Sequence, residues 1–418
     1  MILWENKEAL RKEIERIQTS PYADFYRKKF SFPSTPDSLT ITDLPFLSRT
    51  ELVDTPPAAR LYVPQEDVAF IGFTSGTTSG KPLVSYFSSV ARYFFEPSLG
   101  TSITRALITY PPLNKNFSAS FIQQCRQAER KVTPVFADYQ NLPNSAVLAR
   151  ETRADAIYAT PTIAGNLGEY IAKYYTPEKI RLLALSSETL SQTKRALLTR
   201  QYPNATIANL YASSEIGQFI LYPCAHMLEQ QEPSFHFLCD ALIALELIDG
   251  ELVVTYALNK AFPLIRYRTG DFFEVARESC ACGLPGATLR WSGREQVDKV
   301  RIHGFEIRAE DLENFFASLH GLAGDDYQIH INHDTFDAKK IRIDVELKNK
   351  TGVESHHRNI ADMVKNEMLR HWMLAPGVTL AHAIEKGVIS DIQISFVQEF
   401  SLITTKTRRL VNHCTEYV

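Results

Sequence analysis

Short β-rich runs alternate with helical runs over residues 68–212, and this alternation constrains the fold more than any other feature of the chain. Strands that alternate with helices are typical of a layered α/β domain. Five runs rich in apolar and β-branched residues are predicted as strands: 105–110, 132–137, 156–160, 181–186 and 206–211. The sequence therefore predicts an α/β fold in this part of the chain.

The pattern changes on either side of this region. Residues 9–17 have helical spacing and lead into Pro-rich connections, and no chemistry is visible in the first sixty residues. Further strands are predicted at 237–247, 251–256, 272–276, 328–331, 341–346 and 392–397, and helices at 309–319 and 357–373. We expect a large layered α/β amino-terminal domain, 1–295, with a β-rich subdomain at about 235–293, and a small α+β carboxy-terminal domain, 296–418.

Composition excludes several classes of protein. With 418 residues, 44% hydrophobic and 22% charged, the chain is typical of a globular protein with more than one domain. A net charge of -3 gives no electrostatic reason to expect nucleic acid. The amino terminus becomes charged at Glu5 and no window has the apolar length of a membrane span, so we expect a cytoplasmic protein. The six cysteines favour free thiols or a metal site over a disulfide framework.

Residues 71–82 read Ile-Gly-Phe-Thr-Ser-Gly-Thr-Thr-Ser-Gly-Lys-Pro, an apolar run that leads into hydroxyls, glycines and one lysine. Backbone N–H groups at glycines, hydroxyl donors and the Lys81 ammonium suit phosphate oxygens. The Walker pattern is excluded, because Gly76 and Gly80 enclose three residues and Pro82 follows the lysine. Taken alone, the segment is equally typical of a hairpin turn without a ligand.

Other charged residues lie near predicted strand ends. Glu188, in Leu-Ser-Ser-Glu-Thr, and Glu215, in Asn-Leu-Tyr-Ala-Ser-Ser-Glu, each follow a predicted strand, where ligands collect in α/β sheets. Asp271 closes an Arg-Tyr-Arg-Thr-Gly-Asp run that precedes a predicted strand. Arg294 closes a Trp-Ser-Gly-Arg run, and Lys406 lies in a terminal Thr-Thr-Lys-Thr-Arg-Arg run.

In this order, the motifs resemble those of the adenylate-forming ligases, the superfamily of acyl-CoA synthetases, luciferases and peptide-synthetase adenylation domains. The nearest branch is phenylacetate-CoA ligase, and the resemblance extends from the Ser-Pro-Tyr-Ala-Asp-Phe run at 20–25 to the Cys-Ala-Cys-Gly run at 280–283. In this superfamily a carboxylate attacks the α-phosphorus of ATP, pyrophosphate leaves, and a thiol or amine displaces AMP. The resemblance implies an AMP-forming acid-thiol ligase that uses ATP, Mg²⁺ and coenzyme A, with catalysis by positioning and electrostatics.

The resemblance also implies roles for the matching residues. Lys406 bridges the substrate carboxylate and the α-phosphate, Glu215 binds Mg²⁺ through a hard oxygen ligand, and Thr77 completes the catalytic set. Asp271 accepts hydrogen bonds from the ribose hydroxyls. The other implied ATP-binding residues are Thr74, Ser75, Gly76, Thr78, Gly80 and Lys81 around the phosphates, Ser187, Glu188, Asn209, Tyr211, Ala212, Ser213 and Ser214 around the adenine or acyl group, and Arg294 near the hinge. Singly, Glu215 and Lys406 are equally typical of solvated charges.

Superfamily members rotate the small domain about a hinge that follows the Gly-Arg pair. Gln296 stands where relatives often carry aspartate, and Asp298 is a shifted candidate for the hinge. Four other departures from the usual motifs indicate a divergent member: the additional Ser79, Ala212 and Ser214 in place of glycine and threonine, and Thr405 in place of the glycine before the lysine.

Cysteines and histidines suggest a second site. Cys280 and Cys282, with Cys224 and either His226 or His236, would supply thiolate and imidazole ligands for tetrahedral zinc. Some members of the phenylacetate-CoA ligase branch carry a structural zinc there. Buried free thiols are the alternative, because the Cys-x-Cys spacing is tighter than in a usual zinc knuckle.

The sequence does not determine which carboxylic acid is the substrate or which group accepts the acyl. By resemblance, the runs 113–121 and 136–141 line the acyl pocket. Asn114, Asn116, Ser118 and Ser120 make the first run polar, which favours a hydroxylated or amino-bearing acid, but loop residues that face water are an equal alternative. We expect an aromatic or small organic acid as substrate and coenzyme A as acceptor. The alternatives are a carrier-protein thiol or an amine, and a non-catalytic nucleotide-binding module. A homodimer is suggested only by family habit, and no nucleic-acid or membrane partner is expected.

Overall fold

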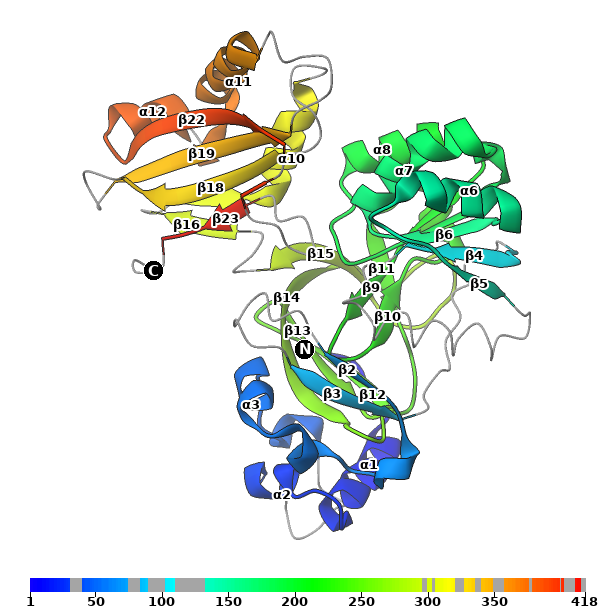
Figure 1. Cartoon of the computed structure of the whole chain (residues 1–418). Coiled ribbons are helices and arrows are strands. Elements are labelled where there is room, and N and C mark those ends of the chain that lie inside the picture. The colour runs from blue at the N-terminus through cyan, green and yellow to red at the C-terminus, as the bar shows by residue number, and fades with distance from the viewer. Residues whose placement is uncertain are drawn as a thin grey trace. The chain divides into compact units, whose positions relative to one another are not determined.

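The computed structural model describes thirteen segments of the chain, whose residues divide into two units, Met1–Ser292 and Gly293–Val418 (Figure 1). The described residues are 1–30, 40–73, 83–88, 102–109, 132–294, 299–302, 305–319, 327–334, 340–348, 357–375, 378–398, 400–401 and 410–414. In this part of the chain, no helix is both long and apolar enough to cross a membrane.

A parallel sheet forms where the sequence predicts alternating strands and helices. Its five strands lie in the order β5-β4-β6-β7-β8 and all their pairings are parallel. They are β4 (Arg105–Ile108), β5 (Thr133–Phe136), β6 (Ala156–Ala159), β7 (Leu182–Leu185) and β8 (Thr206–Asn209). Helices α6 (Leu142–Thr152), α7 (Pro161–Tyr174) and α8 (Gln192–Gln201) cover one face (Figure 1). The predicted layered α/β fold is confirmed.

Both faces of this sheet are buried, as parallel sheets require. Ala156 and Tyr158 of β6 point into one apolar cluster, whereas Ile157 and Ala159 point into another, which α6, α7 and α8 share. The carboxyl ends of β7 and β8 therefore meet at one edge of a rigid layer. Leu185 pairs with Asn209 at that edge.

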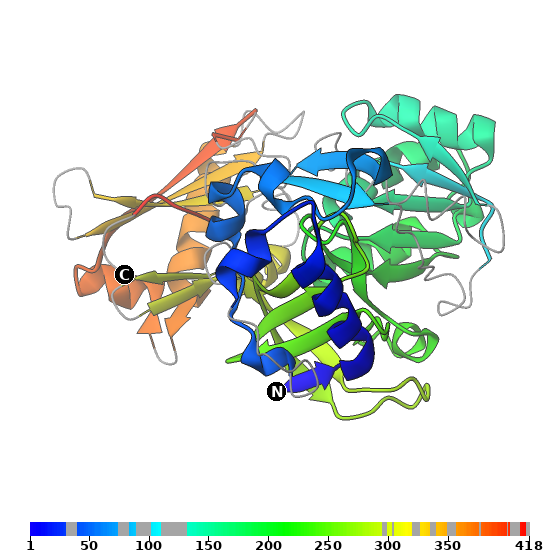
Figure 2. The same cartoon turned by 90° about the horizontal axis from the view of Figure 1, so that it is seen from below.

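An eight-stranded sheet forms the β-rich part of the first unit, in the order β1-β12-β13-β14-β15-β11-β10-β9. Its strands are β1 (Ile2–Trp4), β9 (Tyr211–Ser213), β10 (Gln218–Tyr222), β11 (Ser234–Phe237), β12 (Ile243–Ile248), β13 (Glu251–Tyr256), β14 (Leu264–Arg277) and β15 (Thr288–Arg294). Arg294, the last residue of β15, already belongs to the second unit. Figure 2 shows helix α1 (Lys7–Thr19) beside these strands, and its Ile14 and Ile17 share their core.

Two predictions for this sheet are wrong. The single strand predicted at 237–247 is two strands, because the chain turns at Asp240, whose Oδ1 accepts a hydrogen bond from Leu242 N at 2.8 Å. The Arg-Tyr-Arg-Thr-Gly-Asp run does not precede a strand but lies inside β14. Arg266 has a positive φ of 48°, so the strand is irregular at this point and its sequence does not show the usual alternation.

The amino-terminal segment is attached to β14 by a buried ion pair. Arg266 makes two hydrogen bonds to Glu246 of β12, at 3.0 and 2.8 Å, and both side chains are less than a tenth exposed. The same guanidinium donates to Thr42 O and Leu44 O and lies over the ring of Phe46 at 4.2 Å. It therefore joins two sheet strands to a segment more than two hundred residues earlier.

The remaining elements of the first unit are short. Helices α2 (Phe25–Lys29), α3 (Arg49–Asp54) and α9 (Ala225–Glu229) and 3₁₀ turns at Ile41–Asp43, Pro57–Arg60, Gln65–Asp67 and Pro177–Lys179 connect the larger elements. Strands β2 (Val68–Phe73) and β3 (Val84–Ser88) pair antiparallel on either side of the predicted phosphate loop.

The second unit is α+β, as predicted. A four-stranded sheet in the order β22-β19-β18-β23 holds most of its apolar core together with helices α10, α11 and α12. Its elements are β16 (Lys299–Ile302), β17 (Phe305–Arg308), α10 (Ala309–Ser318), β18 (Tyr327–His333), β19 (Ile341–Lys348), α11 (His357–His371), β20 (Met373–Ala375), β21 (Val378–Thr379), α12 (Leu380–Glu385), β22 (Ile389–Val397) and β23 (Leu410–Asn412).

We expect Glu246→Gln to lower the free energy of unfolding by about 3–5 kcal/mol, because it leaves the buried Arg266 guanidinium without a counter-ion. Urea denaturation followed by circular dichroism measures the change. Glu274→Gln is the matched control, since it removes the partner of Arg290 in an exposed pair worth less than about 1 kcal/mol. Equal losses in the two variants would contradict the role given to Arg266.

Candidate functional site

Two strands of the eight-stranded sheet bring Tyr211 and Asp271 together. The Tyr211 hydroxyl, at the start of β9, donates to Asp271 Oδ2 in β14 at 2.6 Å. Asp271 is only 2% exposed and Tyr211 9%, and the tyrosine ring packs edge-on against Phe273. A buried carboxylate oxygen without a hydrogen-bond partner is costly. Tyr211 is thus both a core tyrosine and the residue that orients Asp271.

Glu215 lies in the turn after β9, where it pairs with an arginine that the sequence did not single out. Arg49 Nη1 forms an ion pair with Glu215 Oε1, and Ser213 Oγ donates to Glu215 Oε2 at 2.6 Å. The two charged side chains are 21% and 13% exposed. Glu215 is therefore not a solvated carboxylate, and the prediction that the first sixty residues carry no visible chemistry missed Arg49.

Local structure fixes the position of Arg49. It is the first residue of α3, which starts with a capping box between Ser48 and Glu51. The backbone of Leu47 bonds to β14 at both groups, with Leu47 N donating to Arg266 O and Arg268 N donating to Leu47 O, each at 2.9 Å. The Ser-x-x-Glu pattern of the capping box could have located the helix start, but no sequence pattern connects Arg49 with Glu215.

Ser187, Glu188 and Asn209 meet at the carboxyl edge of the parallel sheet. Asn209 ends β8, and Ser187, with a positive φ of 74°, follows β7. Glu188 Oε2 accepts a hydrogen bond from Thr162 N, in the first turn of α7, at 3.1 Å. The helix dipole favours a carboxylate there. This edge is where ligands bind in open α/β sheets.

Several predicted residues lie outside the described part of the chain, so their roles stay predictions. They are Thr74, Ser75, Gly76, Thr77, Thr78, Ser79, Gly80 and Lys81 of the loop, residues 113–121 of the acyl-pocket run, Gln296 and Asp298 of the hinge, and Thr405 and Lys406. Ala212 and Ser213 lie in β9, next to Tyr211, and Ser214 follows them.

Strand β3, which leaves the predicted phosphate loop, is held against the loop that contains Glu215. Asn259 Oδ1 accepts from Ser88 N at 3.0 Å, and its Nδ2 donates to Tyr86 O at 2.9 Å. A Cβ atom at Gly217, where φ is +78°, would lie 2.4 Å from the ring of Phe87. Glycine is therefore required for this close approach.

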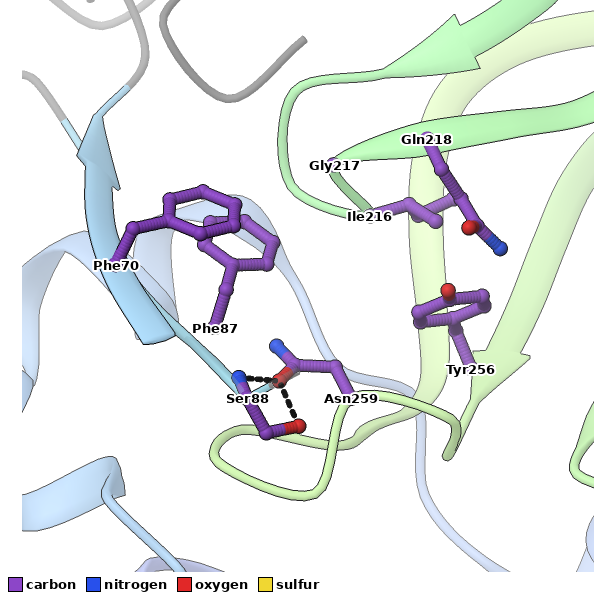
Figure 3. Close-up of a pocket in the computed structure, with 8 residues that line it drawn as sticks. All are labelled: Phe70, Phe87, Ser88, Ile216, Gly217, Gln218, Tyr256 and Asn259. Atoms are coloured by element: carbon purple, nitrogen blue, oxygen red, sulfur yellow. Dashed lines mark hydrogen bonds between the residues drawn. The ribbon is translucent and has the colours of Figure 1, made fainter. Parts of the chain in front are cut away.

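A small cavity of about 10 Å³ lies between these elements (Figure 3). Its lining residues are Phe70, Phe87, Ser88, Ile216, Gly217, Gln218, Tyr256 and Asn259. Substrate pockets usually enclose about 300–1,000 Å³, so the cavity is too small for an acid substrate. The buried Gln218 Nε2 has no hydrogen-bond partner among the described residues, and an ordered water would satisfy it.

In the second unit, the described residues on both sides of the Lys406 segment are attached to neighbouring strands. Ser401 N donates to Glu346 Oε2 of β19 at 2.8 Å, whereas β23 pairs parallel with β18. His413 Nε2 lies 2.9 Å from His330 Nδ1, and His330 Nε2 lies 3.5 Å from Glu346 Oε2. Burial opposes ionisation of Glu346, but hydrogen bonds from Ser401 hold its pKa below the ordinary value.

Four predicted metal ligands meet near the end of β14. One ligand atom each of Cys224, His236, Cys280 and Cys282 lies within 4.8 Å of all the others, and His226 is not among them. Cys224 Sγ is 3.8 Å from Cys280 Sγ, and Cys282 Sγ is 3.2 Å from His236 Nε2. In tetrahedral zinc sites, these pairs lie about 3.8 and about 3.5 Å apart. The donor set fits zinc, with His236 as the imidazole.

The surroundings of the cluster shift the pKa values of its ligand groups in different directions. Burial raises the pKa of Cys224 to about 12, and burial lowers the pKa of His236, which keeps the imidazole neutral. Burial opposes ionisation of Cys282, but its pKa is lowered overall. Among the hydrogen bonds that lower it, the one that Leu284 N donates to Cys282 Sγ contributes most. Buried Nδ1 of His236 has no hydrogen-bond partner among the residues described.

No protein-family model matches the chain, but individual ligases are similar to it in sequence. A phenylacetate-coenzyme A ligase of Thermus thermophilus is 25% identical over 377 residues, which cover 80% of this chain and 83% of that protein. A phenylacetate-coenzyme A ligase of Pseudomonas putida is 24% identical, with 82% of each chain covered. The one of Escherichia coli K12 is 23% identical, with 80% of each covered.

Solved structures of ligases have the same fold. A 2-hydroxyisobutyryl-CoA ligase in the postadenylation state aligns with a TM-score of 0.69 at 17% identity, over 97% of this chain and 88% of that one. An anthranilate CoA ligase in complex with anthranoyl-AMP aligns with a TM-score of 0.53 at 13% identity, over 83% of this chain and 67% of that one.

We expect Tyr211→Phe to lower the free energy of unfolding by about 1.5–3 kcal/mol, because hydrogen bonds to charged groups contribute more than neutral ones. Thermal and urea denaturation measure it. Tyr202→Phe is the control, since its buried hydroxyl donates to the neutral carbonyl of Ala164, and we expect a loss of about 1 kcal/mol. A loss at Tyr211 no larger than at Tyr202 would contradict the role given to the Tyr211–Asp271 hydrogen bond.

Proposed function

The chain is a member of the adenylate-forming superfamily, and on this premise we propose that it activates a carboxylic acid with ATP and transfers the acyl group to coenzyme A. The observation that carries the proposal is the pairing of Tyr211 with Asp271 in the unit that also positions Glu215. Similarity to three phenylacetate-coenzyme A ligases over about four fifths of the chain supports it.

The reaction has two steps. A carboxylate oxygen of the acid attacks the α-phosphorus of ATP, the bond from that phosphorus to the bridging oxygen breaks, and pyrophosphate leaves with the electron pair. The coenzyme A sulfur then attacks the acyl carbon, AMP leaves with the electron pair, and the thiol proton passes to solvent. Negative charge develops in both steps, so positioned cations and hydrogen-bond donors supply most of the catalysis.

Each residue of the site has a place in this proposal. Asp271, oriented by Tyr211, would accept hydrogen bonds from the ribose, and Ser187, Glu188 and Asn209 would border the base. Glu215 offers the carboxylate oxygens that Mg²⁺ prefers, and the bound ion would neutralise the β- and γ-phosphates. Residues 74–81 would hold those phosphates. Lys406 would bridge the carboxylate and the α-phosphate, and the second unit would rotate between the steps.

We propose an aromatic or small organic acid as the substrate, in keeping with the phenylacetate ligases that the chain resembles. A carrier-protein thiol or an amine is the alternative acceptor. A non-catalytic protein that binds the nucleotide without turnover is a further alternative. The hydrogen bond between Tyr211 and Asp271 argues against it, because a site that has lost its function has no need to keep this pair.

Pyrophosphate release tests the function. With ATP, Mg²⁺ and a panel of aromatic and small aliphatic acids, we expect release that depends on the acid, and a thioester when coenzyme A is added. Release with hydroxylamine but no thioester would favour the carrier or amide route. No release with any acid, in protein that binds ATP, would favour the non-catalytic module.

We expect Lys406→Ala to slow adenylation by at least about 100-fold, since it removes a charge from the transition state, while transfer from preformed acyl-adenylate to coenzyme A changes little. Acid-dependent pyrophosphate release and thioester formation from synthetic acyl-adenylate measure the two halves. Lys348→Ala, on an exposed end of β19, is the control. Equal losses in both halves would give Lys406 a structural role.

We also propose that Cys224, His236, Cys280 and Cys282 bind a structural zinc ion. The donor set and the spacing of the ligand atoms support this. The cluster joins three parts of the first unit: the residue before α9, strand β11 and the segment after β14. A bound ion would therefore crosslink β11 to the segments that follow β10 and β14.

We expect close to one zinc per chain in protein purified without chelator, measured by plasma emission spectroscopy. Cys282→Ser should lose most of the zinc and lower the melting temperature, whereas Cys239→Ser, which lies outside the cluster, should retain it. Zinc should be released as the pH falls, because thiolate and neutral imidazole are the ligand forms. A wild-type protein without near-stoichiometric zinc would show that the thiols are simply buried.

A further inference from the structure

Arg49 belongs to the described site, but no nucleotide motif of the sequence includes it. Its guanidinium pairs with Glu215, the carboxylate proposed to bind Mg²⁺, and both side chains are largely withdrawn from water. The ion pair joins residues 166 positions apart, so it reflects the tertiary fold rather than helix pairing. It therefore needs an explanation in terms of the site.

Binding of a metal–nucleotide complex changes the charge balance of this pair. When a divalent cation takes up the Glu215 oxygens, the attraction between Arg49 and that carboxylate weakens. A guanidinium that is only about a fifth exposed cannot regain full hydration, so weakening its ion pair with Glu215 is costly. The incoming triphosphate is the anion that arrives at the same moment, and its oxygens can replace the carboxylate as the partner.

The chemistry and the rigidity of Arg49 both suit this exchange. A guanidinium presents five N–H donors in a planar fork that matches phosphate oxygens. The backbone at Arg49 is fixed by the capping box of α3 and by the two hydrogen bonds of Leu47 to β14. Only the side chain has to turn, so the arginine is preorganised for an anion next to Glu215.

We propose that Arg49 is a nucleotide-binding residue that changes partners. In the ligand-free protein it neutralises Glu215, and when a metal–nucleoside triphosphate binds it pairs with the β,γ-diphosphate portion, and afterwards with pyrophosphate. The inference rests on the proposed function, because it takes Glu215 as the cation ligand and a nucleoside triphosphate as the substrate. A purely structural ion pair between α3 and the Glu215 turn is the opposing interpretation.

Calorimetric titration with Mg·ATP and with AMP, without any acid, separates the two interpretations. We expect Arg49→Gln to weaken Mg·ATP binding by about 10- to 100-fold, the usual effect of losing a charged hydrogen bond, and AMP binding by less than about 2-fold, since AMP lacks the β- and γ-phosphates. Arg49→Lys should recover part of the affinity. Arg16→Gln, which removes a comparably shielded arginine–glutamate pair from α1, should leave both affinities unchanged.

The decisive titrations use protein that carries Glu215→Gln, because this change removes the carboxylate that Arg49 pairs with. If Arg49 contacts the phosphates, adding Arg49→Gln to Glu215→Gln still weakens binding of ATP, and of inorganic pyrophosphate, by about 10-fold or more. If Arg49 only holds Glu215, the second change has no effect, and the inference is wrong. Circular dichroism and melting temperature establish that each variant is folded before titration.

The outcomes also distinguish this inference from the function on which it rests. Wild-type protein that binds Mg·ATP and releases pyrophosphate, together with an Arg49→Gln variant that binds Mg·ATP equally well, overturns the role of Arg49 alone. Equal weakening of ATP and AMP by Arg49→Gln also overturns it. Wild-type protein that binds neither nucleotide overturns the proposed function together with the inference.

Discussion

The attachment of the amino-terminal segment to strand β14 is the interaction on which the candidate site depends. The buried Arg266–Glu246 pair and the backbone bonds of Leu47 hold residues 42–49 against the strand that carries Asp271. This places Arg49 beside Glu215. Without the attachment, Arg49 and Glu215 would lie on separate elements. Each charge would then be shielded from water without an opposite charge beside it, which is unfavourable.

Each carboxylate of the described site accepts a hydrogen bond from another group of the protein. Asp271 accepts from Tyr211, Glu215 from Ser213 and Arg49, and Glu188 from the first turn of α7. Such hydrogen bonds satisfy the shielded carboxylate oxygens and fix the directions of the side chains. For a reaction whose catalysis consists mainly of positioning and electrostatics, this preorganisation is the main contribution that the fold can make.

The strands on either side of the predicted phosphate loop are also closely packed against the rest of the first unit. Asn259 ties β3 to the sheet, and the ring of Phe87 leaves no room for a side chain at Gly217. The two strands that flank the loop and the turn that contains Glu215 are thus parts of one packed arrangement. The cysteine cluster lies near the end of β14, where side chains from three chain segments meet.

The sequence by itself determined the fold class, the five strands of the α/β layer, and β18, β19, β22, α10 and α11 of the second unit, because the alternation of apolar runs is a local property of the chain. It also identified Tyr211, Glu215, Asp271 and the cysteines through motifs. Only the tertiary structure decided that residues 266–271 lie inside a strand, since the irregular backbone at Arg266 hides the usual alternation. It likewise selected His236 over His226 and brought Arg49 to Glu215, because contacts between distant segments leave no periodic trace in a sequence.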